Sequence, residues 1–373
     1  NELIYSICLE NKITDSSINK NDSQLEDELI GLENYYSESE QNPEIYIIYL
    51  SPTPSNQSRD SFEKLDYNKK YHLIVVDVNP LSAGLYWGDE RYLIPYANSK
   101  DYLESIKKLL HITKADFVFI GTDVELLHFA ENKKILESEF NTKIIVSSND
   151  VIKIADDKFK TASFFKTNGF EYPITADPNN LEELEDLILK KGFPLIVKPR
   201  VGARSFQVSK VNDKKSLEYQ LKKTNFPIVQ EHIGSDFNEY TASSLCFDGI
   251  CRASIILKRD LKDGNTYRTF YVDDKKFNLK IKSWTEALKP FGPVNFQFRI
   301  DRNGEPKVFE INARFSGTTP LRAIMGFNEI EMCINKLAYN QEIIQPKIKD
   351  YTILRNWSET IINSLDYSKI EKI

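Results

Sequence analysis

The segment KVFEINARFSG, Lys307–Gly317, alternates apolar residues with Glu310, Asn312 and Arg314. In a β-strand, residues i, i+2 and i+4 share one face. The segment therefore predicts a strand that presents a carboxylate, an amide and a guanidinium on one face, with an apolar face behind them. Carboxylate and amide oxygens are ligands that Mg²⁺ prefers, and a guanidinium is suited to binding phosphate or carboxylate.

A turn signal upstream predicts the partner of this strand. Asn303-Gly304 in DRNGEP is typical of a two-residue type I′ hairpin turn. That turn places Gln297 opposite Glu310. The polar face of the hairpin then comprises Asn295, Gln297, Glu310, Asn312 and Arg314. The other face, expected to lie in the core, comprises Val294, Phe296, Phe298, Phe309, Ile311 and Ala313.

Only one of the oxygen donors on this polar face, Glu310, is anionic. We therefore expect Mg²⁺ to be shared with a bound phosphate rather than enclosed by protein alone. The alternative is a solvated strand face on which Glu310 and Arg314 form a surface ion pair.

Two lysines occupy positions from which they can reach phosphate oxygens. Lys158 stands at the start of a predicted helix in ADDKFKT, and Lys198 ends the apolar strand FPLIVKPR just before a loop that contains a glycine. The strand VQEHI then leads to Glu239 through GSDFNEY. Its backbone groups can pair with an adenine edge, and Glu239 can accept from ribose hydroxyls. Solvated lysines and an ordinary strand and turn remain the alternatives.

The chain changes character along its length. Residues 1–43 are polar and acidic and predict a solvated extension. Apolar strands then alternate with helical patterns up to residue 150, which predicts a doubly wound parallel α/β domain. The expected strands are 44–50, 71–80, 115–123 and 142–148. The segment 51–60 after the first strand contains no glycine, so it does not suit a dinucleotide.

From residue 151 onward the patterns predict an α+β region with antiparallel sheets. EYTASSLCFDGICRASIIL and VNFQFRIDRNGEPKVFEINARF each read as a hairpin. The turn Asp248-Gly249 in the first hairpin places Cys246 opposite Cys251. Thiols in a reducing compartment are the favoured interpretation, and a cross-strand disulfide is the alternative. No CxxC pair suggests a zinc site.

The bulk properties limit the partners. The chain has 373 residues and a formal net charge of -6, which gives no overall attraction to nucleic acid. No apolar run reaches the length of a membrane span, and no signal peptide is visible, although the sequence opens on Asn1 rather than methionine. We expect a cytoplasmic protein with small-molecule substrates and no nucleic-acid or membrane partner.

The order and spacing of these features resemble the ATP-grasp superfamily, in particular its carbamoyl-phosphate-synthase-large-chain-like branch. The stretches that carry the resemblance are IADDKFKT, FPLIVKPR, VQEHI, GPVNFQF and VFEINARFSGTTPL, preceded by DVNPLSAGLYWGDERYLIPYA. The resemblance implies a pre-ATP-grasp domain at 44–150 and an ATP-grasp domain at 151–341, followed by a tail at 342–373. Within the ATP-grasp domain it implies a lid at about 157–230 and a catalytic part at about 231–341.

The resemblance also implies roles for particular residues. Lys158 and Lys198 would hold the phosphates of ATP. The adenine hinge would be Gln230, Glu231, His232 and Ile233, with Glu239 at the ribose. Two Mg²⁺ ions, with Mn²⁺ as an alternative, would be held by Gln297 with Glu310 and by Glu310 with Asn312. Arg314 would stabilise the transferring group, aided by Lys258 and Arg259. Ser316, Gly317 and Thr318 would lie near the acceptor.

By this resemblance the chain would be an ATP-dependent ligase that activates a small-molecule or peptide carboxylate as an acyl phosphate and joins it to an amine, releasing ADP and phosphate. The resemblance is also compatible with a homodimer. A kinase or carboxyphosphate-forming enzyme on the same fold is one alternative. A non-catalytic nucleotide-binding scaffold is another. The loop RVGARSFQVSK has one glycine, where phosphate loops of the family carry several, and this favours the scaffold. The linker before Glu239 is also longer than the family pattern. Only one ATP unit and no amidotransferase or biotin-attachment segment are visible.

Overall fold

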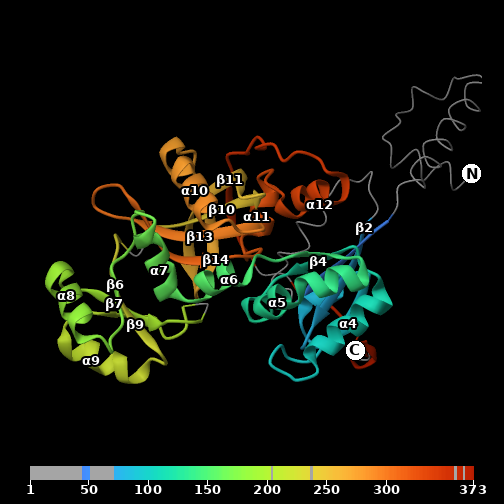
Figure 1. Cartoon of the computed structure of the whole chain (residues 1–373), viewed down its shortest axis with the longest axis horizontal. Helices are drawn as coiled ribbons and strands as arrows, with labels where there is room; N and C mark the ends of the chain where they lie inside the picture. The colour runs from blue at the N-terminus through green and yellow to red at the C-terminus, as the bar shows by residue number, and fades with distance from the viewer. Residues whose placement is uncertain (1–43, 51–70, 203–204, 236–237, 357–358, 364–365) are drawn as a thin grey trace, which may run out of the picture. The chain divides into compact units, whose positions relative to one another are not determined.

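The computed structural model describes residues 44–50, 71–202, 205–235, 238–356, 359–363 and 366–373. The expected polar extension at 1–43 and the glycine-free segment at 51–60 lie outside these residues. The described helices and strands all belong to one compact unit. Three sheets organise them, and Figure 1 shows each with the helices that flank it.

The first sheet is parallel throughout, in the order β16-β3-β2-β1-β4-β5. Its strands are β1 (Ile45–Leu50), β2 (Tyr71–Asp77), β3 (Glu90–Leu93), β4 (Phe117–Ile120), β5 (Lys143–Ile145) and β16 (Glu371–Lys372). Its helices are α4 (Tyr102–Thr113) and α5 (Asp123–Phe140), with α6 (Asn149–Asp156) after β5. The predicted doubly wound parallel domain is confirmed. The strands β3 and β16 were not predicted, because β3 is short and only partly buried and β16 has two exposed residues.

The second sheet has four antiparallel strands in the order β6-β9-β7-β8. The strands are β6 (Thr175–Ala176), β7 (Leu195–Pro199), β8 (Ser209–Val211) and β9 (Pro227–Glu231). Two helices, α8 (Leu181–Lys191) and α9 (Lys214–Lys223), pack their apolar residues against it. This small core is separate from the rest, so the sheet and its helices form a lobe with its own packing.

The third sheet has six antiparallel strands in the order β14-β13-β10-β11-β12-β15. The strands are β10 (Glu239–Phe247), β11 (Ile250–Lys262), β12 (Asn265–Tyr271), β13 (Gly292–Ile300), β14 (Pro306–Asn312) and β15 (Thr352–Leu354). The remaining elements are α7 (Lys158–Thr167), α10 (Lys275–Leu288), α11 (Thr319–Ile324), α12 (Glu329–Tyr339) and the short 3-10 turns η2 (Ala83–Trp87) and η3 (Tyr367–Lys369). Both expected hairpins are present, and β12 and β15 extend the sheet beyond them.

The expected tail at 342–373 is integrated into the fold rather than appended to it. It supplies β15, which pairs with β12, and β16, which pairs with β3. One edge strand of the third sheet and one of the first sheet therefore come from the same short segment.

Aromatic packing fixes the back of the third sheet. Trp284 of α10 makes edge-to-face contacts with Phe296 and Phe298 of β13, at ring-centroid distances of 5.6 and 6.0 Å. Phe165 of α7 contacts the same tryptophan at 5.5 Å. Such contacts stabilise beyond the area they bury. They hold α7 against the strands, and α7 begins at Lys158.

The turn of the β13–β14 hairpin differs from the prediction. The backbone N–H of Asp301 donates to the carbonyl of Glu305, so three residues form the loop, and Gly304 adopts a left-handed conformation with φ of 78°. This is the three-residue hairpin loop that ends in a glycine bulge, rather than a two-residue type I′ turn. The register next to the turn is therefore shifted by one residue from the predicted one, and Phe298 pairs with Val308.

A bulge further along the strands restores the predicted pairing. The register changes between Gln297 and Phe298, so that Gln297 faces Glu310 and Asn295 faces Asn312. These two pairings are confirmed. The bulge falls at Phe309, which moves its ring out of the core and onto the polar face. The expected core position of Phe309 is therefore wrong, and Val308 is buried in its place.

The two hairpin cysteines pair in register as predicted, Cys246 with Cys251. Both are free thiols in the structure. Burial raises the pKa of the Cys246 thiol to about 12 and that of Cys251 to about 11. Low thiolate content makes both slow to react by exchange.

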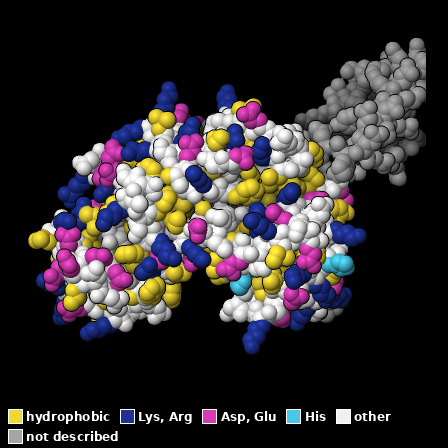
Figure 2. Space-filling model, in the orientation of Figure 1, with side chains coloured by type: hydrophobic (Ala, Val, Ile, Leu, Met, Phe, Trp, Pro, Cys, Tyr) yellow, Lys and Arg dark blue, Asp and Glu magenta, His cyan; other side chains and the backbone are white. Residues whose placement is uncertain are grey.

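Within the described residues, no helix is long and apolar enough to cross a membrane. Figure 2 shows basic and acidic side chains interspersed over the visible face of the molecule.

Candidate active site

A pocket lies between the second and third sheets. It is lined by residues of β7 and β9 on one side and of β11, β13 and β14 on the other, together with Lys158 from the start of α7. Sequence reasoning predicted part of this lining as site residues: Lys158, Lys198, Gln230, Glu231, Ile233, Glu239, Arg259, Gln297 and Glu310. It did not identify the apolar part, which includes Ile196, Pro199, Phe206, Val208, Leu261 and Phe309.

The two lysines enter the pocket from different elements. Lys158 Nζ donates to the backbone carbonyl of Gly202 at 2.6 Å. Lys198 Nζ donates to Gln230 Oε1 at 2.8 Å and to the carbonyl of Phe309 at 3.4 Å. Both lysines are buried, and in the described part of the chain their hydrogen bonds go to neutral oxygens only. A buried cation that is not in direct contact with a carboxylate is costly, so both positions favour an anionic ligand.

The environment of Lys198 has a strong effect on its protonation. Burial lowers its pKa from 10.5 to about 7, and the nearby charge of Lys158 acts in the same direction. Glu310 and Glu239 oppose this shift by favouring the charged form. An anion bound next to Lys198 would raise the pKa again and restore its positive charge.

The predicted metal ligands lie together on the β13–β14 hairpin. Gln297 Nε2 and Asn312 Nδ2 both donate to Glu310 Oε1, each at 3.3 Å. The oxygen of each amide is engaged as well, since Gln297 Oε1 accepts from Arg259 at 2.6 Å and Asn312 Oδ1 accepts from Arg314 at 3.3 Å. A carbonyl oxygen has two lone pairs, so each amide retains acceptor capacity for a cation. No group of three or more acidic, histidine or cysteine residues that could hold a metal occurs among the described residues.

Glu239, expected at the ribose, is held between two arginines. Its Oε1 accepts from Arg259 Nη2 at 2.6 Å, and its Oε2 accepts from Arg299 Nη2 at 3.0 Å. Arg299 was missed, although it follows Gln297 by two residues on the same strand face, and that spacing was sufficient to find it. With Lys158 and Lys198, these arginines give the pocket four cationic groups.

Seven predicted site residues are not part of the pocket lining: His232, Lys258, Asn312, Arg314, Ser316, Gly317 and Thr318. Lys258 precedes Arg259 on β11 and therefore points to the opposite face of the sheet, where it pairs across the strand with Tyr240. Its expected position at the transferring group is incorrect for this reason. His232 is likewise absent from the lining, while Glu231 and Ile233 on either side of it are present. Glu231 also forms ion pairs, with Lys191 at 2.8 Å and Lys307 at 3.5 Å.

The glycine-poor loop after β7 still takes up backbone conformations that glycine favours. Ser205 and Gln207 both have φ of 55°, in the left-handed region, on either side of Phe206. Non-glycine residues there carry strain. The side chain of Gln207 holds the loop, because its Oε1 accepts from the backbone N–H of Asn225 at 3.1 Å. Arg204 of this loop lies outside the described residues.

Arg314 is bound by a residue of the first sheet region that was not predicted as its partner. Arg314 Nε and Nη2 donate to the two carboxylate oxygens of Asp123, at 2.6 and 2.5 Å. Burial is the largest single influence on Asp123 and acts to raise its pKa. The charge and hydrogen bonds of Arg314, together with the charge of Lys158, outweigh burial and lower that pKa below its usual value. Asp123 is the first residue of α5, and nothing in the sequence links it to Arg314.

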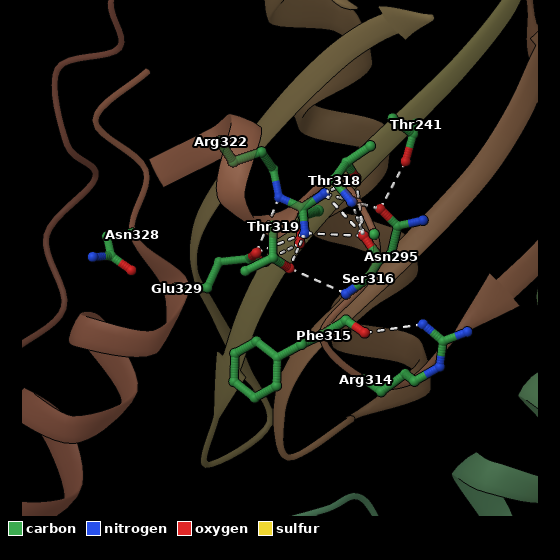
Figure 3. Close-up of polar contacts among 12 residues, drawn as sticks. Thr241, Asn295, Arg314, Phe315, Ser316, Thr318, Thr319, Arg322, Asn328 and Glu329 are labelled. Carbon is green, nitrogen blue, oxygen red and sulfur yellow. Dashed lines mark hydrogen bonds and ion pairs between the residues drawn. The ribbon is translucent and has the colours of Figure 1, made fainter. Parts of the chain in front are cut away.

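A second polar cluster, which we call the Arg322 cluster, lies beneath the loop that follows β14 (Figure 3). At its centre Arg322 Nη2 donates to Glu329 Oε2 at 2.6 Å, and the two side chains are 1% and 0% exposed. The remaining members are Ser316, Thr318, Thr319, Asn295, Ser243 and Thr241. Sequence reasoning placed Asn295 on the polar face of the hairpin but did not find Arg322 or Glu329.

The predicted acceptor loop therefore has a defined support. Arg322 donates to the hydroxyl oxygens of Ser316 and Thr318. The carbonyl of Gly317 accepts from Arg355 of the C-terminal segment. Arg322 and Arg355 thus both bind this loop. The hydroxyl groups of Ser316 and Thr318 and the carbonyl of Gly317 already have protein partners.

Comparison with known families agrees with this arrangement. Residues 155–318 match the ATP-grasp domain family, and residues 56–145 match the family described as PylC-like, N-terminal domain. The chain carries an ATP-grasp domain. All the residues assigned to nucleotide, metal and acceptor lie within the matched segment, which begins just before Lys158 and ends at Thr318. The predicted resemblance to this superfamily is confirmed.

A curated relative of this protein is the carbamoyl phosphate synthase large chain of Sulfurisphaera tokodaii. The two are 23% identical over 313 residues, which is 78% of this chain but 29% of that relative. The chain spans still less of two multifunctional proteins that it also matches, 9% and 11% of their lengths. It therefore corresponds to a part of these relatives.

Several solved structures share the fold of this protein. The L-amino acid ligase from Bacillus licheniformis superposes with a TM-score of 0.61 at 18% identity, covering 81% of this chain and 77% of that one. The N5-carboxyaminoimidazole synthetase from Staphylococcus aureus, solved with ADP, gives 0.59 at 14% identity and covers 84% and 93%. At these identities the likeness establishes the fold.

Proposed function

We propose that this protein is an ATP-dependent ligase that activates a carboxylate as an acyl phosphate and joins it to an amine, releasing ADP and phosphate. The observation that carries the proposal is the pocket in which Lys158 and Lys198 face the Gln297–Glu310 pair, with hydrogen bonds, among the described residues, to neutral oxygens only. The pocket thus contains both the cations that a polyphosphate requires and the oxygen ligands that its metal ion requires. The membership of the chain in the ATP-grasp superfamily supports the same reaction class.

The residues of the pocket fit ATP and Mg²⁺. Lys158 and Lys198 would hold phosphate oxygens, and the β9 segment from Gln230 to Ile233 would contact the base. Glu310, with the amide oxygens of Gln297 and Asn312, would hold Mg²⁺, and hard oxygen donors without histidine or cysteine suit this ion. Because the set contains a single carboxylate, we propose that the phosphates complete the coordination. One ion or two, and Mn²⁺ in place of Mg²⁺, are compatible with these donors.

The chemistry needs positioning and charge neutralisation rather than a protein nucleophile. When bound, the metal ion would neutralise the phosphate charge and make the terminal phosphoryl group easier to transfer. Lys198 and Lys158 would orient the phosphates, and Arg314 would stabilise negative charge at the transferring group. Transfer to a carboxylate gives it a good leaving group, which an amine then displaces to form an amide.

The ribose assignment requires a modification. Because Arg259 and Arg299 already bind both oxygens of Glu239, we propose that its second role is to position these two arginines in the pocket. Each carboxylate oxygen can accept more than one hydrogen bond, so a contact with ribose remains compatible with this role.

The test is phosphate release from Mg-ATP over a panel of amino acids and small carboxylates, each alone and paired with amines. Release that requires one carboxylate and one amine would establish the ligase and identify both substrates. Release that requires the carboxylate alone would indicate a kinase or carboxyphosphate-forming enzyme. ATP binding detected by thermal shift without any release would favour a non-catalytic scaffold, the function that the glycine-poor loop supports.

A further inference from the structure

Arg314 has little freedom to act as a two-point anion clamp. Its four hydrogen bonds go to the two oxygens of Asp123, to Asn312 Oδ1 and to the carbonyl of Phe315, the last at 2.9 Å. A guanidinium has five N–H donors. Among the described residues, a single N–H on Nη1 is left over. The Nε–Nη2 edge of a guanidinium can donate two parallel hydrogen bonds to a carboxylate or phosphate. In Arg314 this edge already binds Asp123.

Asp123 is itself fixed at its place in the fold. It is the first residue of α5, where the partial positive charge of the helix terminus favours a carboxylate. The terminus is braced by Glu125, whose carboxylate accepts from Thr122 at 2.6 Å and from Tyr102 of α4 at 2.9 Å. Glu125 is 2% exposed, so this brace belongs to the core.

We propose that Asp123 is a positioning residue for Arg314: it holds the guanidinium beside Asn312 so that the Nη1 edge alone is presented to the reacting group. The inference rests on the proposed ligase function, because the reacting group is the one that this function assigns. Asp123 belongs to the segment that precedes the ATP-grasp domain. By this inference, that segment takes part in building the catalytic strand as well as in any substrate contacts.

The opposite interpretation makes a different prediction. If Asp123 were a competitor that occupies the anion site of Arg314 until substrate displaces it, its removal would free the fork and improve the reaction. If it positions Arg314, its removal lets the guanidinium move, and displacements of about 1 Å in an active site cost up to about a hundredfold in rate.

The experiment compares Asp123→Asn, Asp123→Glu and the control Asp186→Asn in the full chain. Asp186 forms an exposed ion pair with Lys190 on α8 at 2.7 Å, so its loss tests the general effect of removing a carboxylate. For Asp123→Asn we expect kcat to fall about 10- to 100-fold while the KM for ATP changes less than about twofold. Asp123→Glu, which keeps the carboxylate, should recover part of kcat, and Asp186→Asn should match the wild type. An unchanged or raised kcat in Asp123→Asn overturns the proposal.

A second readout separates this inference from the ligase assignment. The Nε–H of Arg314, assigned in ¹⁵N-arginine spectra by its loss in Arg314→Lys, should exchange slowly with solvent in the wild type and rapidly in Asp123→Asn. Persistent slow exchange in Asp123→Asn would overturn the positioning role even in a protein that turns over no substrate. A wild-type chain that binds Mg-ATP but ligates nothing would count against the proposed function alone.

Discussion

Two polar clusters lie beside the β13–β14 hairpin, and they differ in how far their groups satisfy one another. In the Arg322 cluster every donor of the central guanidinium has an acceptor, and both charged side chains are almost fully buried. In the pocket, the two lysines donate to neutral acceptors only, as far as the described residues go, and the oxygens of Glu310 and its amide neighbours retain free capacity. The first cluster is complete without a ligand. The second is complete only with an anion and a cation, which is the composition of a metal nucleotide.

This difference between the Arg322 cluster and the pocket indicates which buried polar groups are expected to bind a ligand. Burial and charge alone do not distinguish the clusters, since Lys198 and Arg322 are both buried cations. The distinction is whether the counter-charge is supplied by the protein. The following predictions test it from either side.

The largest effect is expected from breaking the complete cluster. Arg322→Met leaves Glu329 buried without its partner, and we expect the free energy of unfolding to fall by about 3–5 kcal/mol. Urea denaturation measures the change. In the double variant Arg322→Met/Glu329→Met no charge remains unpaired, so most of the loss should be recovered. Equal destabilisation of the single and double variants would show that the cluster is not a matched ion pair.

Removal of the metal-ligating carboxylate should affect activity instead of stability. Glu310→Ala is expected to lower Mg-ATP turnover by about 10²–10³-fold, because the charge that positions the metal is lost. Its thermal unfolding should stay close to that of wild type, since Glu310 has only amide partners at 3.3 Å. Glu185→Ala on the exposed face of α8 is the matched control. A turnover unchanged from wild type would refute the metal assignment.

Lys198 predicts a pH dependence of nucleotide binding. Its pKa is about 7 in the folded protein and about 10.4 in an unfolded chain, so the folded protein loses this proton as pH rises through about 7. Folding stability should therefore gain with pH between about 7 and 10, where only the unfolded chain holds the proton. Nucleotide phosphates favour the charged lysine, so affinity should fall as pH rises above about 7.

Calorimetry at pH 8 in buffers of different ionisation enthalpy tests this. Binding of Mg-ATP should take up a proton in the wild type and none in Lys198→Arg, whose guanidinium is always charged. Lys198→Ala should weaken binding by roughly 10- to 100-fold, the value of a charged hydrogen bond. Identical proton uptake in the wild type and in Lys198→Arg would remove Lys198 from the phosphate site.

The smallest effect is expected in the loop after β7. Ser205→Gly relieves a left-handed backbone strain of about 1 kcal/mol but adds freedom to the unfolded chain, so its net effect on stability should be below about 1 kcal/mol. Ser283→Gly in the exposed face of α10 should instead destabilise by about 0.5 kcal/mol, because glycine lowers helix stability relative to serine. Urea denaturation of both variants measures the two changes in stability. Equal destabilisation by the two changes would mean that the left-handed conformation of Ser205 carries no strain.

The sequence predicted the parts of the fold and site that depend on local periodicity. Two-residue alternation brought Gln297, Glu310 and Asn312 together correctly. The underlying turn was wrong, and the pairing survived because the bulge at Phe309 compensates for the extra residue in the loop. Bulges have no strong sequence signal in an apolar strand, which is why Phe309 was placed in the core.

The remaining residues depend on tertiary contacts. Arg322 and Glu329 are seven residues apart and meet only because α11 and α12 fold over β13, while Asp123 and Arg314 are separated by 191 residues. A buried arginine in TPLRAI cannot be recognised without knowing which carboxylate reaches it. The two residues of β16 give no pattern at all.

The strand β16 has a consequence for the order of folding. It pairs with β3, and nearby Ser105 lies within hydrogen-bonding distance of the carbonyl of Ile373, 268 residues later. During vectorial synthesis the β3 edge must stay unpaired until almost all of these residues have left the ribosome. Exposed strand edges recruit other strands, and contacts of such long range form slowly. The β3 edge is therefore open to edge-to-edge aggregation throughout the interval in which the ATP-grasp region is synthesised.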